Sequence, residues 1–411
     1  MISRRTALAL TGGAALTAAL ARAIDQGLVV DFGSPALAAW DDWNQHRHQG
    51  PLALVAAAVL ASSPHNTQPW RFAVGRLGVD IFEVPGRNLG SMDPFGRERL
   101  AGLGAAIHNM ALASTLTGRA ALVRLLPDAG NPQHVARVEL GGEGTGAAPH
   151  PLLPAIGRRH VHRGPWTGAA IAAADLPALT DFPRPADIRI AVFPAAAPRG
   201  QRFAAVTAAA TAAIAGDAAM MADSHRWFRH SRRDQDRLMD GLSLRTSGVS
   251  PLLGFAGAML PDPSPEDEGR YWLAATRDTH LPSASAYALI TCPDPHDRRT
   301  ALLVGAAWQR LHLIATARGL VAQPLNQLPE MLDRARQLGQ ASPFATDAEA
   351  LAAGAGRIGF ALRLGHADPA PPALRRPVSL VIGAPARLGY DIDRARAETL
   401  AQERALAARN N

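Results

Sequence analysis

Apolar runs separated by short polar breaks dominate the first third of the chain. Runs rich in Ala, Leu and Val are typical of buried helices, and short runs of β-branched and aromatic residues are typical of strands. This pattern predicts helices at 51–61 and 102–116 and strands at 72–74, 79–84 and 135–140. A break rich in Gly and Pro at 141–154 then predicts a domain boundary.

The rest of the chain repeats this alternation, with one long exception. A helix is predicted at 152–159, and strands are predicted at 188–193, 286–291 and 378–382. The stretch 223–267 is instead rich in Arg, His, Trp and Pro and lacks the pattern of a core element. A polar insertion of this length is typical of a covering segment, so we expect it to act as a lid.

One helical pattern occurs twice at a constant offset. The series Gly104, Ala105, Ala106, Leu112, Thr115 and Gly118 matches Gly305, Ala306, Ala307, Leu313, Thr316 and Gly319. Chance similarity between alanine-rich helices is the alternative, but the glycines at both ends of the series also match. A duplication is therefore favoured. The chain of 411 residues is long enough for two cores, since single cores stop growing near about 250–300 residues.

The basic residues are all arginine, because the sequence contains no lysine, and the net charge is +7. The absence of lysine excludes Schiff-base enzymes and P-loop nucleotide sites. Arginine is a forked, permanently charged donor that suits phosphate, although a biased genome explains the same composition. The arginines are spread along the chain and aromatic residues make up 5%, so we expect no nucleic-acid partner. Cys292 is the single cysteine, which excludes an internal disulfide.

The first residues have the features of a targeting segment. Ser3-Arg4-Arg5-Thr6 precedes an apolar run, 7–20, that is short for a membrane span. The segment resembles a twin-arginine (Tat) signal, so we expect a signal peptide at 1–38 with cleavage at 21–23 or 36–38. This implies export of a folded protein to the periplasm or another extracytoplasmic compartment, without a stable membrane span. An uncleaved anchor and an ordinary N-terminal helix are the alternatives.

Polar side chains gather in the loop after the first predicted helix. Two prolines fix the backbone there, and short polar side chains lie between them. The string runs Ser62-Ser63-Pro64-His65-Asn66-Thr67-Gln68-Pro69-Trp70. A preset array of donors and acceptors suits a planar heteroaromatic ligand, whereas a turn whose Ser and Asn cap backbone groups has the same composition.

This string resembles the PSxxNxQPW element of the nitroreductase superfamily, which reaches an FMN bound mainly by the other subunit of a dimer. The stretch 156–163 is similar to the family's RRSxR element, whose arginines hold the ribityl phosphate. The resemblance implies FMN contacts from Arg158, Arg159, His160 and Arg163. Guanidinium groups would give a dianion contacts worth about 1.5–3 kcal/mol each before desolvation. A solvated arginine surface is the alternative.

Two later stretches complete the resemblance. The loop 319–326 is similar to the family's loop at the reactive edge of the flavin, which implies contacts from Gln323, Pro324 and Leu325. The stretch 364–377 resembles the family's closing segment, from which either Arg375 or Arg376 returns to the phosphate.

The distribution of these elements implies one site per chain. The first half has the loop element, but its arginine counterpart near 46–48 is degenerate, and the second half has the arginines. This arrangement resembles the Acg family of FMN-binding oxidoreductases, which have a lid over the flavin. It implies an α+β nitroreductase-like fold, in which two fused homologous halves, 40–146 and 150–411, mimic a nitroreductase dimer within a monomer.

The resemblance implies hydride transfer through flavin N5 to an unknown nitro- or quinone-like acceptor, with NAD(P)H or another reductant as donor. An FMN-sequestering or storage protein with a closed lid is the alternative function. No catalytic side chain is assigned. The glycine-rich stretch 142–146 has the wrong spacing for a dinucleotide loop. The His46/His48 and His160/His162 pairs lack partner ligands, so we expect no metal there.

Overall fold

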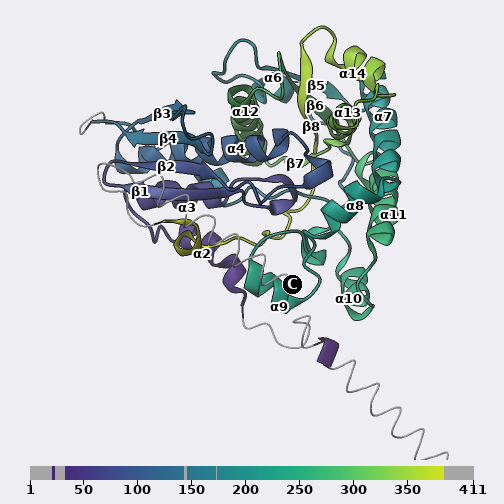
Figure 1. Ribbon diagram of the computed structural model, residues 1–411, viewed down its shortest axis with the longest axis horizontal. Helices are drawn as coiled ribbons and strands as arrows, with labels where there is room; N and C mark the ends of the chain where they lie inside the picture. The colour runs from purple at the N-terminus through teal and green to yellow at the C-terminus, as the bar shows by residue number, and fades with distance from the viewer. Residues whose placement is uncertain (1–20, 24–32, 143–145, 173, 384–411) are drawn as a thin grey trace, which may run out of the picture.

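A computed structural model describes residues 21–23, 33–142, 146–172 and 174–383, and Figure 1 shows the arrangement of their elements. The twin-arginine motif expected at the start of the chain lies outside these residues. Both expected cleavage sites, 21–23 and 36–38, lie within them. At the later site Ala36 is fully buried, and its carbonyl accepts a hydrogen bond of 2.7 Å from the backbone N–H of Arg375.

The first half is a four-stranded antiparallel sheet packed against helices. Its strands follow the order β1-β2-β4-β3. They are β1 (Trp70–Gly75), β2 (Gly78–Glu83), β3 (Ala121–Leu125) and β4 (His134–Leu140), and the helices are α2 (Ala38–Asn44), α3 (Pro51–Val59) and α4 (Arg97–Ala113). β1 and β2 contain the strands predicted at 72–74 and 79–84 and form a hairpin, and a Cβ at Gly78 would lie 2.6 Å from the carbonyl oxygen of Val138 in β4, so the approach of β4 requires glycine there.

The second half repeats this topology. Its sheet order, β5-β6-β8-β7, is equivalent to that of the first half, and α12 follows the second strand as α4 does. The strands are β5 (Arg189–Pro194), β6 (Ala286–Cys292), β7 (Val321–Pro324) and β8 (Arg357–Gly365), and the helices outside the expected lid are α5 (Leu153–Ile156), α6 (Asp175–Ala178), α7 (Pro198–Ala215), α12 (Arg298–Ala317), α13 (Gln327–Gln337) and α14 (Ala345–Ala352). The predicted α+β class and organisation in two halves are therefore confirmed.

Single-turn elements complete the chain path. They are the 3₁₀ turns η1 (Pro35–Leu37), η2 (Pro64–Asn66), η3 (Gly90–Met92), η4 (Ser114–Thr117) and η5 (Leu244–Thr246), and the π turn η6 (Thr276–His280). Burial raises the pKa of the free thiol of Cys292, in β6, to about 12, so this cysteine is an inert core residue.

The two halves meet along α4 and α12, which lie side by side between the two sheets (Figure 1). The chain also returns from the second half to the first after β8. Ile382 forms a parallel bridge with Phe72 of β1, and the backbone N–H of Gly383 donates to the carbonyl of Phe72 at 2.8 Å. A segment of the second half thus extends the sheet of the first.

Two local predictions need correction, and the strands β3, β7 and β8 were not predicted. The strand predicted at 378–382 is wrong for most of its length, because the helical turn α15 (Val378–Val381) follows Pro377 and only Ile382 pairs as a strand. The helix predicted at 152–159 is confined to α5. Sequence patterns did not predict the edge strand β3, whose side chains alternate between exposed and half-buried. A short strand with one exposed face offers little apolar pattern.

The segment 223–267, here called the lid segment, consists of short helices. It begins in α8 (Ala218–His225), contains α9 (Arg232–Leu238) and α10 (Pro251–Met259), and ends in α11 (Pro265–Ala275). Among the described residues, no single helix is long and apolar enough to cross a membrane, and α7 with α8 passes that test only as a pair bent by 86°.

Candidate functional site

The loop between α3 and β1 has an unusual backbone. His65, Asn66 and Gln68 have φ angles of 43°, 56° and 50°. Positive φ is uncommon for residues other than glycine, and such strain persists only where surrounding contacts enforce it. Ser63 supplies one such contact, because its Oγ accepts a hydrogen bond of 2.9 Å from the N–H of Gln68.

Ser62 connects this loop to the other half of the molecule. Its Oγ accepts a hydrogen bond of 2.8 Å from the indole N–H of Trp308, in α12. Pro64 begins the 3₁₀ turn η2, whose φ it fixes. The first two serines therefore hold the loop in place, and His65, Asn66 and Gln68 are left to contact other parts of the chain.

The lid segment lies directly against this loop. Asn66 exchanges hydrogen bonds with Gly241, donating from Nδ2 to its carbonyl at 3.1 Å and accepting from its N–H at 3.2 Å. His65 Nε2 is 2.8 Å from the hydroxyl of Ser224. Gln68 Nε2 donates to the carbonyl of Met239 at 2.8 Å.

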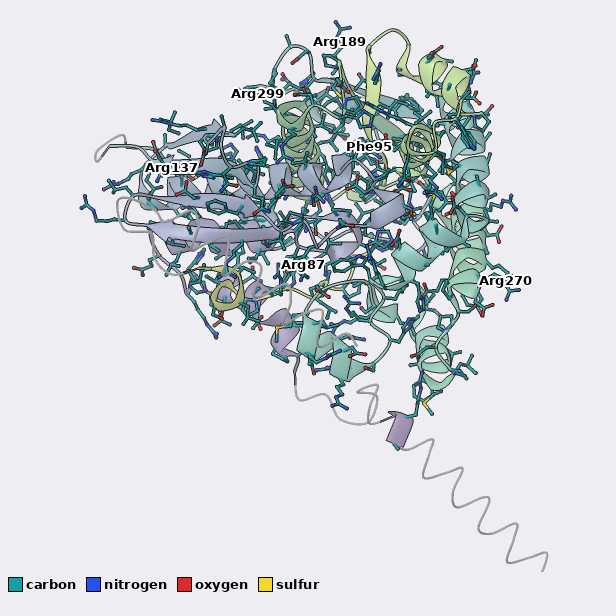
Figure 2. The ribbon with its side chains drawn as sticks, in the orientation of Figure 1. Arg87, Phe95, Arg137, Arg189, Arg270 and Arg299 are labelled. Carbon is teal, nitrogen blue, oxygen red and sulfur yellow. The ribbon has the colours of Figure 1, made fainter. Side chains whose placement is uncertain are left out.

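A buried ion cluster anchors the lid segment to the first half. Asp240 pairs with Arg87, which also donates from Nε to the carbonyl of Thr67 at 2.6 Å. The same carboxylate pairs with Arg229 at 2.7 Å. Figure 2 labels Arg87 below the first sheet, at its boundary with the lid segment. Removing one partner of a buried ion pair is strongly destabilising, so this contact holds the segment closed.

Three predicted arginines converge beside the loop. Arg159 and Arg375 are 1% and 3% exposed, and Arg163 is half-buried. Their guanidinium groups donate to backbone carbonyls, Arg159 to Leu60 at 2.8 Å and Arg163 to Thr246 at 3.2 Å. Arg375 also donates to the amide oxygen of Asn66. None of the three forms an ion pair with a carboxylate of the described residues.

This cluster carries uncompensated positive charge. Burial lowers the pKa of Arg159 and that of Arg163 to about 10. Burial, followed by repulsion from these two arginines, lowers the pKa of Arg375 well below its ordinary value. The Nε atoms of Arg159 and Arg375 are buried and lack a hydrogen-bond partner. A buried charge and an unpaired donor both cost free energy. The cluster is therefore a place where an anion would be stabilised.

Aromatic and imidazole rings line the same cluster. Trp40, in α2, contacts the ring of His160 edge-on at 4.5 Å, and the guanidinium of Arg375 lies 5.2 Å from the Trp40 ring. Burial, followed by the charges of Arg159 and Arg375, lowers the pKa of His160 to about 3, so this ring is neutral near pH 7. The sequence predicted His160 here but gave no signal for Trp40.

The structure separates the two C-terminal arginines. Arg375 lies with Arg159 and Arg163, whereas Arg376 binds the backbone of the loop. The N–H of Arg376 donates to the side-chain oxygen of Gln68 at 2.9 Å, and its guanidinium donates to the Gln68 carbonyl at 2.5 Å. This arrangement favours Arg375 as the anion contact and Arg376 as a support for the loop.

The remaining predicted residues lie in different surroundings. Arg158 is exposed and donates to the carbonyl of Pro154 at 3.3 Å, so the structure does not bring it into the cluster. Leu325 is fully buried in the core of the second half. Pro324 ends β7, where it pairs with Leu362.

Gln323 contacts an arginine, Arg363, that the sequence did not indicate as a site residue. Its side-chain oxygen accepts a hydrogen bond of 2.7 Å from Nε of Arg363, which is fully buried in β8 and lies 3.7 Å from the centre of the Trp166 ring. Burial lowers the pKa of Arg363 to about 9. Both ring nitrogens of the neighbouring His280 are buried without a partner.

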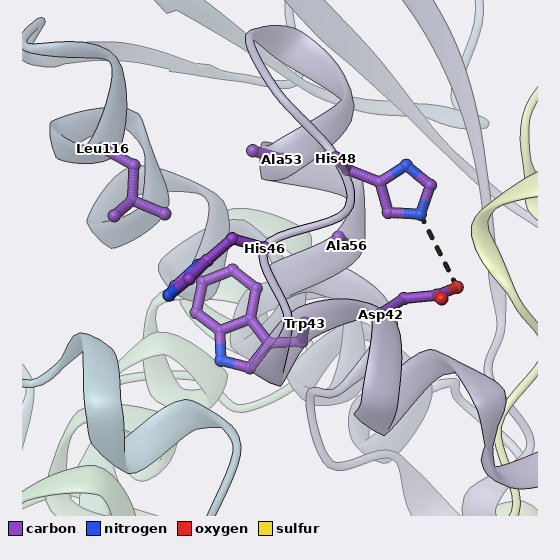
Figure 3. Close-up of a pocket in the computed structure, with 7 residues that line it drawn as sticks. All are labelled: Asp42, Trp43, His46, His48, Ala53, Ala56 and Leu116. Carbon is purple, nitrogen blue, oxygen red and sulfur yellow. Dashed lines mark ion pairs between the residues drawn. The ribbon is translucent and has the colours of Figure 1, made fainter.

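A small pocket occurs near residues 46–48, the stretch that the resemblance makes the first-half counterpart of the arginine element. Its lining includes Asp42, Trp43, His46 and His48 (Figure 3). Its cavity volume of about 10 Å³ has room for about one water molecule and not for a flavin. Asp42 pairs with Arg47 at 3.0 Å and lies 3.7 Å from His48. Arg47 therefore has a carboxylate partner, whereas Arg159 and Arg375 have none among the described residues.

Two curated proteins are similar in sequence to this chain. The chain is 29% identical to "Putative NAD(P)H nitroreductase Rv3131" of Mycobacterium tuberculosis over 358 residues, which is 82% of this chain and 91% of that protein. It is 35% identical to "Putative NAD(P)H nitroreductase acg" of the same organism over 85 residues, which is 21% of this chain and 26% of that protein. No family model matches the chain.

Solved structures give weaker similarity. The FMN-dependent nitroreductase NfnB from Mycobacterium smegmatis, in complex with NADPH, has a TM-score of 0.30 and 13% identity, with 53% of this chain and 89% of that chain covered. A nitroreductase-like family protein from Bacillus cereus has a TM-score of 0.29 and 15% identity, with 56% and 93% covered. The chain is thus similar, over most of its length, to curated proteins whose names describe them as nitroreductases.

Proposed function

We propose that the chain is an FMN-binding oxidoreductase with a single FMN held between its two halves. The observation that carries this proposal is the cluster of buried Arg159 and Arg375 with half-buried Arg163, which has no carboxylate partner among the described residues and lies beside the strained loop 62–70. A flavin phosphate is a dianion that would complete this cluster with charge-assisted hydrogen bonds. The same stretches resemble nitroreductase elements, which supports FMN as the molecule that carries this phosphate.

Each part of the site has a distinct role in this proposal. Arg159, Arg163 and Arg375 would hold the phosphate, and Asn66 and Gln68, which bond to Arg375 and Arg376, would position this part of the site. When bound, FMN supplies hydride transfer through N5 to a nitro- or quinone-like acceptor. The names of the curated relatives support NAD(P)H as the reductant. Burial, followed by the charge of Arg163, lowers the pKa of His65 to about 4, so we assign this side chain a neutral positioning role.

A second function, sequestration of FMN, is supported by the contacts of the lid segment. The reciprocal bonds between Asn66 and Gly241 and the buried Arg87–Asp240 pair hold the segment against the loop. A segment held this tightly would shield a bound flavin from substrates, and cofactor retention would then be the function itself.

The cellular setting is also part of the proposal. The Tat-like sequence supports export of the folded chain to an extracytoplasmic compartment, with the pseudo-dimer acting as a monomer. Ala36 is buried and hydrogen-bonded to Arg375. This supports cleavage at 21–23 rather than 36–38, because the later cut would remove a residue packed beside the proposed site.

The visible spectrum of the purified protein tests both functions. The protein, reconstituted with FMN and freed of excess cofactor, should retain one flavin per chain. Anaerobic NAD(P)H should then bleach the flavin if the protein is an oxidoreductase, and an unchanged spectrum with full retention would indicate sequestration. Failure to retain FMN would contradict both.

Two neighbouring arginines provide a matched pair of variants. Arg159→Gln should weaken FMN binding at least tenfold, because one charge-assisted contact worth about 1.5–3 kcal/mol is lost. Arg158→Gln should bind FMN as the wild type does, because Arg158 is exposed. Equal affinities in the two variants would contradict the assignment of the phosphate site.

A further inference from the structure

Three potential metal ligands meet at the base of the lid segment. His225 ends α8, His230 lies in the connection to α9, and Glu268 lies in the first turns of α11. His225 Nδ1 is 3.0 Å from Glu268 Oε2, and His230 Nε2 is 3.3 Å from Glu268 Oε1. The ligand atoms of the three residues lie within 4.8 Å of one another.

The polar atoms of this cluster face one another as imidazole–carboxylate pairs, but they form no hydrogen bond of normal geometry with the described residues. Glu268 is 6% exposed, and both of its carboxylate oxygens are buried without a hydrogen bond, as are Nδ1 of His225 and Nε2 of His230. A buried carboxylate without hydrogen bonds is costly unless another charge compensates it. Phe228 stacks on the ring of His230, with centroids 6.0 Å apart and planes inclined by 16°, and so restrains its orientation.

The spacing of these atoms matches a metal coordination shell. Zn²⁺ binds imidazole nitrogen and carboxylate oxygen at about 2.0–2.2 Å, and two ligands of a tetrahedral shell then lie about 3.3 Å apart. The separations of 3.0 Å and 3.3 Å, each from one imidazole nitrogen to a different oxygen of Glu268, are close to this value. We propose that His225, His230 and Glu268 bind a divalent transition metal of the Zn²⁺ class, with the fourth position left for water.

The sequence positions of the three ligands suggest what the metal does. His225 lies near the beginning of the lid segment and Glu268 directly follows its end. A metal that binds both closes this long stretch into a loop, which restricts the unfolded chain and stabilises the folded segment. Ser224, the neighbour of His225, contacts His65 at 2.8 Å. The metal would therefore hold α8 in the position from which it touches the loop 62–70.

Metal titration of the full, tag-free chain tests this proposal without any flavin, so its outcome is independent of the FMN assignment. After stripping with a chelator, titration with Zn²⁺ in a calorimeter should show one saturable site per chain. His225→Asn and His230→Asn should each weaken this binding at least tenfold. Both side chains are partly exposed, at 33% and 23%, so the substitutions should be tolerated, and circular dichroism checks the fold.

His134→Asn is the matched control. His134 lies 2.8 Å from the buried carboxylate of Asp80 but belongs to no group of three potential ligands among the described residues, so this variant should bind Zn²⁺ as the wild type does. Zn²⁺ should also raise the melting temperature of the wild type and the control but not of the two ligand variants. Co²⁺ in the wild-type protein should give the visible absorption bands of a tetrahedral nitrogen and oxygen site. Absence of saturable binding, absence of these bands, or equal affinity in all variants would overturn the proposal.

Discussion

Gly104 of α4 and Gly305 of α12 make equivalent contacts across the boundary between the two halves. A Cβ on Gly104 would overlap the carbonyl oxygen of Leu302, and a Cβ on Gly305 would overlap that of Ala101. Leu302 lies three positions before Gly305, and Ala101 lies three positions before Gly104. The two helices are thus related by an approximate twofold axis, and their backbones touch at that axis.

Alanine at either glycine should separate the two helices. The opposing atom is a backbone carbonyl that cannot turn aside, so we expect Gly104→Ala or Gly305→Ala to destabilise the protein by about 1–3 kcal/mol or more. Urea unfolding measures this change. Gly142→Ala is the control, because no atom lies within 4 Å of its added Cβ. Equal unfolding free energies for the three variants would contradict the close helix contact.

Inorganic phosphate should stabilise the protein in the absence of flavin. A phosphate ion would offset the mutual repulsion of Arg159, Arg163 and Arg375, so the melting temperature should rise with phosphate concentration. Arg375→Met should abolish most of this rise. Arg189→Met, at an exposed position in β5, should retain it. An increase that chloride at equal ionic strength reproduces would show that no specific anion site exists.

Asn66→Ala should affect both the cofactor and the lid segment. The change removes donors to the carbonyls of Gly241, at 3.1 Å, and Leu374, at 2.8 Å, and each hydrogen bond contributes about 1 kcal/mol. We therefore expect FMN affinity to fall about tenfold and proteases to cut the lid segment faster. Asn131→Ala, in the turn before β4, should change neither property. Normal FMN affinity together with faster proteolysis would show that Asn66 holds the lid segment in place but does not contribute to flavin binding.

Buried histidines should make the protein sensitive to mild acid. Burial lowers the pKa of His108, His160 and His280 from the ordinary value of 6.5 to about 3. The unfolded chain takes up protons on these rings below pH 6.5 while the folded chain does not, so stability is lost as the pH falls from 6.5 toward 3. At pH 5, each ring should cost about 2 kcal/mol relative to pH 7.5.

The variant His108→Gln tests this dependence away from the proposed cofactor site. Its melting temperature should fall less than that of the wild type between pH 7.5 and pH 5, because one proton-binding ring is absent. The difference between the two proteins isolates His108, since all other titrating groups are shared. Parallel melting curves would show that this ring does not contribute.

Most of the predictions about the site rest on short, continuous stretches of sequence. The loop 62–70 and the arginines Arg159 and Arg163 each lie in a short stretch whose composition indicates a ligand site. Arg363 and Trp40 lie in ordinary strand and helix patterns, and tertiary folding alone brings them beside those stretches.

Ligands far apart in sequence were harder to predict. Glu268 lies in an acidic first turn of α11, which reads as an ordinary helix start. His225 and His230 are separated by four residues, a spacing found in zinc sites, but nothing in the sequence connects Glu268 with this pair. The strand predicted at 378–382 failed for a different reason. β-branched residues favour extended structure on average, but Pro377 begins a helical turn there, and propensity is a weak guide over four residues.

The matching order of strands in the two halves has an evolutionary consequence. In a homodimer of identical chains, every substitution appears at both ends of the assembly, so neither end can change alone. Joining two copies in one polypeptide removes this restriction. In this chain Arg47 has Asp42 as an internal partner, whereas Arg159 and Arg375 have no carboxylate partner among the described residues. Fusion thus permits a molecule with approximate twofold symmetry to specialise its ends separately.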